Sequence, residues 1–212
     1  MKHNWTGRCR NEVEEAAPEK AGREIMVAEP KVLEVVENRI YFYSEIDRES
    51  VLTLNRHLRT KQNDALYRKQ MEECDCVAPI YLHIQSYGGS IFAGLAAMDQ
   101  ILQSKKQVPI HTIVDGCAAS AATFITVAGT KRFINPNAFL LIHQLSSVMW
   151  GKYSEMQDEM QNMDRLMDKI REVYGRYATI PNGKLDGILK HDLWISPKDC
   201  LKYGLVDEVL KA

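Results

Sequence analysis

Short apolar runs, rich in β-branched and aromatic residues, alternate along this chain with segments of helical character. The runs, each ended by polar or turn-forming residues, are 40–43, 80–84, 110–114 and 139–142. The helix-like segments that follow the first three runs are 48–60, 90–104 and 120–127. Strands that alternate with helices form parallel sheets through right-handed crossovers, and the helices pack on the sheet. The sequence therefore predicts an α/β fold.

The charged residues nearly balance, with 27 Lys and Arg against 28 Asp and Glu and a formal net charge of -1 at pH 7. This balance gives no electrostatic reason to expect a nucleic acid or an anionic membrane as a partner. No apolar run approaches the roughly 20 residues of a membrane-spanning helix, and the first thirty residues lack the apolar core of a secretory signal. We therefore expect no membrane partner and a cytoplasmic location.

The five cysteines are an odd number at scattered positions, which favours a reducing compartment over a disulfide framework. Cys74 and Cys76 could supply half of a metal site. Because no second ligand pair has metal-like spacing, we predict that the chain holds no metal.

Composition also divides the chain. Residues 1–30 are charged and poor in aromatic side chains, which predicts a flexible N-terminal tail ahead of one domain over 31–212. Within that domain, the polar stretch 61–76 is longer than most connections between a helix and a strand. It predicts an exposed excursion.

A long stripe of apolar residues recurs with alternating spacings of four and three, which predicts a helix over approximately 148–178. Its members are Met149, Tyr153, Met156, Met160, Met163, Met167, Ile170, Tyr174 and Tyr177. Such a stripe is typical of a core helix that covers the sheet. Its narrowness and its methionines, which adapt to irregular surfaces, make a projecting helix shared with another subunit a second candidate.

Ser120 lies among alanines, just after the third predicted strand, where ligands collect in an open α/β sheet. Small neighbours permit a sharp turn, and a helix N-terminus offers unsatisfied N–H groups to an oxyanion. These features fit a nucleophile. They fit an ordinary N-cap serine equally well.

Three further groups could complete a hydrolytic site around Ser120. Gly88 and Gly89 follow the second strand and could expose main-chain N–H groups, although a plain turn uses glycine too. His143 ends the fourth apolar run, and its near-neutral pKa suits a general base. Asp192 could orient that base, with Asp115 and Asp207 as competitors.

Four motifs together resemble the proteolytic subunit of the Clp protease, ClpP, from about residue 38 to residue 209. They are Ser86-x-Gly88-Gly89, Gly116-Cys117-Ala118-Ala119-Ser120, Pro136-Asn137 with Ile142-His143-Gln144, and Asp192-x-x-x-Ser196 with Tyr203-Gly204-Leu205-Val206-Asp207. The resemblance implies a crotonase-like fold of repeated ββα units and an ATP-dependent Clp protease proteolytic subunit. Such a subunit is a serine endopeptidase that hydrolyses unfolded polypeptides to short peptides inside a chamber of heptameric rings, stacked as a tetradecamer.

The same resemblance assigns roles to residues of this chain. Ser120 would be the nucleophile, His143 the general base and Asp192 the orienting carboxylate, with the N–H groups of Gly88 and Ala121 as the oxyanion hole. The helix at 148–178 would be the handle that joins two rings, and residues 1–30 would include the axial segment. An AAA+ unfoldase partner would use the ATP, so this chain would need no cofactor.

The chain departs from the family pattern at three places. Tyr87 stands where the family has proline, Ala121 where methionine commonly follows the nucleophile, and Leu145-Ser146-Ser147 where proline and a glycine pair are usual. In the family, the segment that corresponds to this last change helps to join the two rings. The change therefore bears on the assembly of a double ring and not on the triad. Two alternatives stay open, a catalytically silent subunit of a mixed ring and an acyl-CoA enzyme of the wider crotonase superfamily, although the filled positions Ser120, His143 and Asp192 argue against both.

Overall fold

The computed structural model describes residues 32–71, 76–181 and 183–211. The strands are β1 Val32–Val36, β2 Arg39–Tyr43, β3 Ile80–Ser86, β4 Ile110–Ala119, β5 Lys131–Ile134, β6 Phe139–Leu141 and β7 Glu208–Val209. The helices are α1 Arg48–Met71, α2 Ile91–Ser104, α3 Ala122–Val127, α4 Tyr153–Tyr177, α5 Leu185–Leu189 and α6 Pro197–Lys202. The predicted tail at residues 1–30 lies outside the described residues.

One sheet of seven strands, in the order β1-β2-β3-β4-β5-β7, organises the chain, and β6 pairs with β4 beside this path. β1 and β2 form an antiparallel pair, and the other pairs are parallel. All four apolar runs are strands, so the predicted α/β fold is confirmed. β4 is the longest strand because it continues past Asp115 and Gly116, where the apolar run ends.

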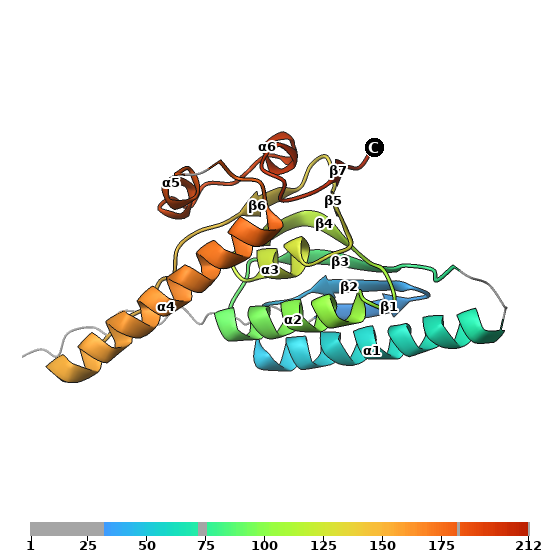
Figure 1. Ribbon diagram of the computed structural model, residues 1–212, viewed down its shortest axis with the longest axis horizontal. Coiled ribbons are helices and arrows are strands. Elements are labelled where there is room, and N and C mark those ends of the chain that lie inside the picture. The colour runs from blue at the N-terminus through green and yellow to red at the C-terminus, as the bar shows by residue number, and fades with distance from the viewer. Residues whose placement is uncertain (1–31, 72–75, 182, 212) are drawn as a thin grey trace, which may run out of the picture.

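Helices α1, α2 and α3 pack beside one another on one face of the sheet (Figure 1). The alternate residues Ile40 and Phe42 of β2 and Leu82 and Ile84 of β3 point to this face and are fully buried. A strand places successive side chains on opposite faces, so the intervening residues form a second face. That second face is only half-buried and carries aromatic and polar side chains, among them His83.

The stretch 61–76 is not the exposed excursion that its polarity suggested, because α1 continues without a break to Met71. Residues 61–71 contain helix-forming side chains and neither glycine nor proline, so nothing in the sequence stops the helix. Ala65 and Leu66 also pack against the edge of the core. Tertiary packing of these two side chains therefore outweighs the polarity of the rest of the segment. Residues 72–75 lie outside the described part.

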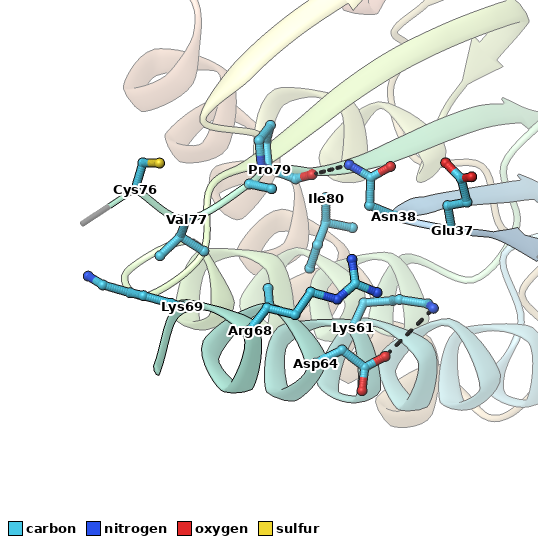
Figure 2. Close-up of a pocket in the computed structure, with 12 residues that line it drawn as sticks. Glu37, Asn38, Lys61, Asp64, Arg68, Lys69, Cys76, Val77, Pro79 and Ile80 are labelled. Atoms are coloured by element: carbon cyan, nitrogen blue, oxygen red, sulfur yellow. Dashed lines mark hydrogen bonds and ion pairs between the residues drawn. The ribbon is translucent and has the colours of Figure 1, made fainter. Parts of the chain in front are cut away.

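The extension of α1 borders a cavity of about 440 Å³, closed on its other side by the β1–β2 turn and by the segment that leads into β3 (Figure 2). Lys61 and Asp64 form an ion pair across one turn of the helix, at 3.7 Å. Asn38 donates a hydrogen bond to the carbonyl of Pro79 at 2.8 Å. No residue of the predicted catalytic set lines this cavity.

The predicted long helix is confirmed as α4, which begins at Tyr153 rather than near residue 148. The Glu155 carboxylate accepts a hydrogen bond from the Lys152 N–H and so marks its first turn. In its C-terminal half, Ile170 and Tyr174 are buried against the domain. The N-terminal half projects away from the body of the molecule (Figure 1).

Candidate active site

Ser120 occupies a sharp turn between β4 and α3 with a backbone φ of 53°, in the left-handed region that non-glycine residues rarely adopt. Its N–H donates to the carbonyl of Leu141 on β6 at 2.8 Å, and its carbonyl accepts from the N–H of Thr123 at 3.0 Å. The N-cap position of α3 belongs to Ala121 and has no side-chain cap, so the interpretation of Ser120 as a capping serine is wrong. The structure over-determines a strained conformation here, which is common at functional sites.

The turn formed by Gly88 and Gly89 packs directly on the Ser120 turn. Both glycines have positive φ, 102° and 141°. A Cβ atom at Gly88 would lie 2.7 Å from the carbonyl oxygen of Ala119 and 2.7 Å from the Cβ of Ser120. Glycine is therefore required at this position both for its backbone angles and for the close approach of the two turns.

The main-chain donors beside Ser120 are not equivalent. The Gly88 N–H donates to the Ser86 hydroxyl at 3.1 Å, so in this conformation it already has a partner. Gly89 and Ala121 line the same cavity as Ser120, whereas Gly88 does not. Gly89 therefore borders the cavity, and the assignment of the Gly88 N–H as an oxyanion donor stays a prediction.

His143 follows β6, which runs parallel to 117–119 of β4 and so brings the imidazole to the same edge as the Ser120 turn. Its Nδ1 atom lies 3.2 Å from Oδ1 of Asp192. The loop that carries Asp192 is tied to β6 by two main-chain hydrogen bonds between Leu140 and Ile195. The His143 side chain is 26% exposed and that of Asp192 is 79% exposed.

The two competing carboxylates have other partners. Asp207 pairs with Arg132; burial alone would raise the pKa of Asp207, but the hydrogen bonds and charge of Arg132 hold it below its ordinary value. Asp115 accepts a hydrogen bond from His83 at 2.8 Å. In the described structure neither of them pairs with His143. Of the three candidate carboxylates, only Asp192 in the α5–α6 loop lies beside this imidazole.

Ser120 and His143 line one cavity of about 320 Å³. Its apolar walls are formed by Ile91, Ala121, Phe124, Ile170 and Tyr174. Among the described residues, no hydrogen bond joins the Ser120 hydroxyl to the imidazole of His143. Such bonds are often long in an empty site and tighten when a substrate binds.

Two site residues were not singled out for this site from the sequence. The Thr123 hydroxyl lies 2.6 Å from both the Ser120 carbonyl and the hydroxyl of Tyr174 on α4. Burial raises the pKa of Tyr174, so its phenol stays protonated. The stripe of α4 predicted that Tyr174 would be buried, but only the packing of α4 on α3 places it under the site.

The fold and this edge of the sheet define the class to which the chain belongs, that of the crotonase-like α/β proteins. A family model described as Clp protease matches residues 35–212. The chain therefore belongs to the Clp protease family, which is a family of peptidases.

Curated relatives agree with this assignment. An ATP-dependent Clp protease proteolytic subunit of Deinococcus radiodurans is 32% identical over 133 residues, which is 62% of this chain and 64% of the relative. The ATP-dependent Clp protease proteolytic subunit 2 of Treponema denticola is 33% identical over 143 residues, 66% of this chain and 70% of the relative. The matched region thus spans about two thirds of the length of each relative, and the resemblance to a divergent member of the family is confirmed.

In the described part of the chain, no helix combines the length and the apolar character that crossing a membrane requires. Nor do the described residues bring three or more His, Cys, Asp or Glu side chains together in a way that could hold a metal ion. The Cys74 half of the cysteine pair lies outside the described residues.

Proposed function

We propose that this protein is the proteolytic subunit of an ATP-dependent Clp protease, a serine endopeptidase that hydrolyses unfolded polypeptides to short peptides. One observation carries the proposal. The strained Ser120 turn and His143, which is paired with Asp192, open onto a single cavity. Membership of a peptidase family supports the same reaction class.

In the proposed mechanism, the Ser120 hydroxyl attacks the carbonyl carbon of a peptide bond while His143 accepts the hydroxyl proton. Because Nδ1 of His143 is directed at Asp192, Nε2 is the atom available as the base. The tetrahedral intermediate collapses when His143 returns the proton to the leaving amine nitrogen, and an acyl-serine remains. Water then attacks the acyl carbon by the reverse sequence of proton transfers and releases the carboxylate product.

The developing oxyanion would accept hydrogen bonds from the Ala121 N–H and from the glycine turn. Gly89 already borders the cavity, whereas Gly88 would have to exchange its bond to Ser86 for one to the oxyanion. Loss of one such donor typically lowers kcat by about 10²–10³-fold. The glycine turn is therefore proposed as part of the oxyanion hole, with Gly88 as the donor predicted from the sequence.

The proposed assembly is a homo-oligomer of heptameric rings, stacked as a tetradecamer in the cytoplasm and supplied with unfolded chains by an AAA+ unfoldase that consumes ATP. The projecting half of α4 supports this assembly, because Met156 and Met160 are 40% and 51% exposed there. Both relatives are also named ATP-dependent. Selectivity would follow from the chamber, which a folded protein cannot enter.

The test is a fluorophosphonate probe, applied to the purified full-length protein, with the adduct located by mass spectrometry. We expect labelling at Ser120 that disappears in the Ser120→Ala variant, together with hydrolysis of an unstructured peptide. Absence of labelling in an assembled ring would instead identify a catalytically silent subunit. Turnover of an acyl-CoA without peptide hydrolysis would identify an enzyme of the wider crotonase superfamily.

A further inference from the structure

A network of polar side chains lies on the half-buried face of the sheet, outside the candidate active site. Its centre is Asp115, whose side chain is only 15% exposed. Oδ2 accepts hydrogen bonds from the Tyr43 hydroxyl and from Nδ1 of His83, each at 2.8 Å, and Oδ1 accepts one from the Asn135 amide at 2.5 Å. The three donors come from β2, from β3 and from the residue after β5.

The surroundings of His83 fix its tautomer. Its Nε2 atom lies 3.0 Å from Nη1 of Arg39, and a guanidinium nitrogen can only donate, so Nε2 accepts. The proton of the neutral ring is therefore on Nδ1, which donates to Asp115. Tyr41 stacks on the ring, with 4.5 Å between the centroids, and restricts its rotation.

Tyr43 is also held as a donor. Burial and the neighbouring Asp115 carboxylate both raise the pKa of Tyr43, so the phenol keeps its proton. The Asp115 carboxylate therefore accepts hydrogen bonds from three donors, each from a different segment of the sheet.

Asp115 lies where β4 changes its pairing. The register with β3 passes from Ile84 opposite Val114 to Ser86 opposite Ala118, so β4 carries two more residues than β3 across this interval. On the other edge, β5 pairs with 111–114 and β6 pairs with 117–119. β4 therefore contains a bulge, with Gly116 at a φ of 73°.

The strand beyond this bulge does little to specify its own register. Its residues are Cys117, Ala118 and Ala119, whose small side chains give no strong alternation of large apolar and polar groups. Register is weakly determined where such a pattern is missing, and a slip moves the chain by about 3.3 Å per residue. Ser120 follows immediately, so any slip of this segment would displace its hydroxyl from the cavity.

We infer that Asp115 is a positioning residue for Ser120. Its three hydrogen bonds fix the bulge at one place in β4, and the fixed bulge sets the register of 117–119 and thus the location of the Ser120 turn. The inference rests on the proposed role of Ser120 as the nucleophile. In the described part of the chain, the hydrogen bonds of Asp115 go to Tyr43, His83 and Asn135, none of which lines the cavity, so Asp115 would act through the strand.

The test compares the Asp115→Asn and Tyr43→Phe variants with the wild-type protein. An asparagine presents one acceptor oxygen and an N–H₂ group, so at least one of the three donors loses its partner. We expect Asp115→Asn to lower the rate constant for fluorophosphonate labelling of Ser120 by about 10–100-fold, because a displacement near 1 Å can have an effect of that size. Tyr43→Phe removes one donor, and we expect a smaller decrease.

His111→Gln is the matched control, because His111 lies on the same face of β4 and contacts Tyr81 and Phe133 but not Asp115. We expect this control to label at the wild-type rate. For peptide hydrolysis, kcat per titrated site should fall in Asp115→Asn while KM stays unchanged. A purely structural role would lower the melting temperature and the number of titratable sites but would leave kcat per site intact.

Hydrogen exchange provides a readout that does not need activity. We expect amides of 117–122 to exchange faster in Asp115→Asn and to be unchanged in His111→Gln. Equal labelling rates and equal exchange in the wild type and both network variants would overturn the inference. If Asp115→Asn fails to fold, the Tyr43→Phe variant becomes the test. A kcat per site equal to that of the wild type in Tyr43→Phe would then contradict the inference. Wild-type protein that is never labelled would overturn the proposed function, while the exchange comparison would still test the positioning of the turn.

Discussion

At the scale of single residues, the site depends on backbone conformations that few side chains tolerate. Ser120 adopts a positive φ although it is not glycine. Gly88 packs so closely against Ser120 that there is no room for a Cβ atom. A strained residue persists only where its surroundings over-determine it. Here the surroundings are the Leu141 carbonyl, the Thr123 side chain and the glycine turn.

The Gly88→Ala variant tests this close approach. The added Cβ would meet the Ala119 carbonyl oxygen and the Ser120 Cβ at 2.7 Å, at a φ that alanine disfavours. We expect the free energy of unfolding to fall by about 1–3 kcal/mol and labelling at Ser120 to be slowed in the folded fraction. Urea unfolding and probe labelling provide the two measurements.

Gly175→Ala is the control for that experiment. Gly175 lies in α4, and nothing lies within 4 Å of a Cβ built there. The same substitution should therefore increase stability by about 0.5–1 kcal/mol, since alanine loses less backbone entropy in a helix. Equal effects at the two glycines would contradict the steric argument.

At the scale of elements, the two halves of α4 differ in burial, and the shared-helix interpretation of its apolar stripe stays a prediction for the exposed half. Its C-terminal half is a core helix, because Ile170, Val173 and Tyr174 are buried. Its N-terminal half has no partner among the described residues that covers Met156 and Met160. Met167 belongs to the packed half, since it accepts a hydrogen bond from the Leu145 N–H at its sulfur.

Substitutions in the exposed half should therefore affect assembly without affecting the fold. We expect Met156→Lys with Met160→Lys to convert large assemblies into single rings or smaller species, because lysines cannot be buried unpaired in an apolar contact. Light scattering measures the mass. The control is Gln161→Lys with Asn162→Lys, which adds the same charge to exposed positions off the stripe. An unchanged mass in the methionine variant would exclude α4 as the joining element.

At the scale of the whole molecule, the last part of the chain is tied back to the sheet through Arg132 of β5. Its guanidinium donates to the carbonyls of Tyr177 and Gly204 and to the Asp207 carboxylate. β7 then pairs with β5 directly after Asp207. One side chain thus connects the end of α4, the turn after α6 and the last strand.

Because the connection includes the Asp207 carboxylate, the free energy of unfolding should depend on pH under acidic conditions. The pKa of Asp207 in the folded protein lies below its ordinary value, which applies to the unfolded chain. The ion pair therefore stabilises the fold fully at pH values above the ordinary pKa. This stabilisation is lost as the pH falls through the lowered pKa of the folded protein. We expect Asp207→Asn to lower the free energy of unfolding at pH 7 by about 1 kcal/mol or less, since the carboxylate is 42% exposed. The difference should persist to about pH 4 and disappear below it.

Urea unfolding at pH 7, 4 and 3 measures this dependence. Asp186→Asn is the control, because the ion pair between Asp186 and Arg171 lies on the exposed surface. Its loss should lower the free energy of unfolding by less than the loss of the Asp207 pair. A difference between Asp207→Asn and the wild type that grows as the pH falls would contradict the sign of the linkage.

Local patterns in the sequence determined the types and order of the elements around the site. Runs of β-branched and aromatic residues, each ended by polar or turn-forming residues, predicted β2, β3, β4 and β6 because both signals act within a few residues. The same reasoning brought Ser120, the glycine turn and His143 to one edge, since parallel strands share their carboxyl ends. The extension of α1 was mispredicted because polarity was taken as evidence against helix.

Tertiary structure alone decided which partners the polar groups have. Asp115 and Asp192 were both candidate partners for His143 in the sequence, yet the first pairs with His83 and only the second with His143. The choice depends on contacts between residues far apart in the chain, such as Tyr43 and Asp115, which are separated by 72 positions. Periodicity reports the face on which a side chain lies, and it carries no information about distant groups that share that face. The bulge in β4 arises from such contacts, because β3, β5 and β6 pair with different parts of that strand.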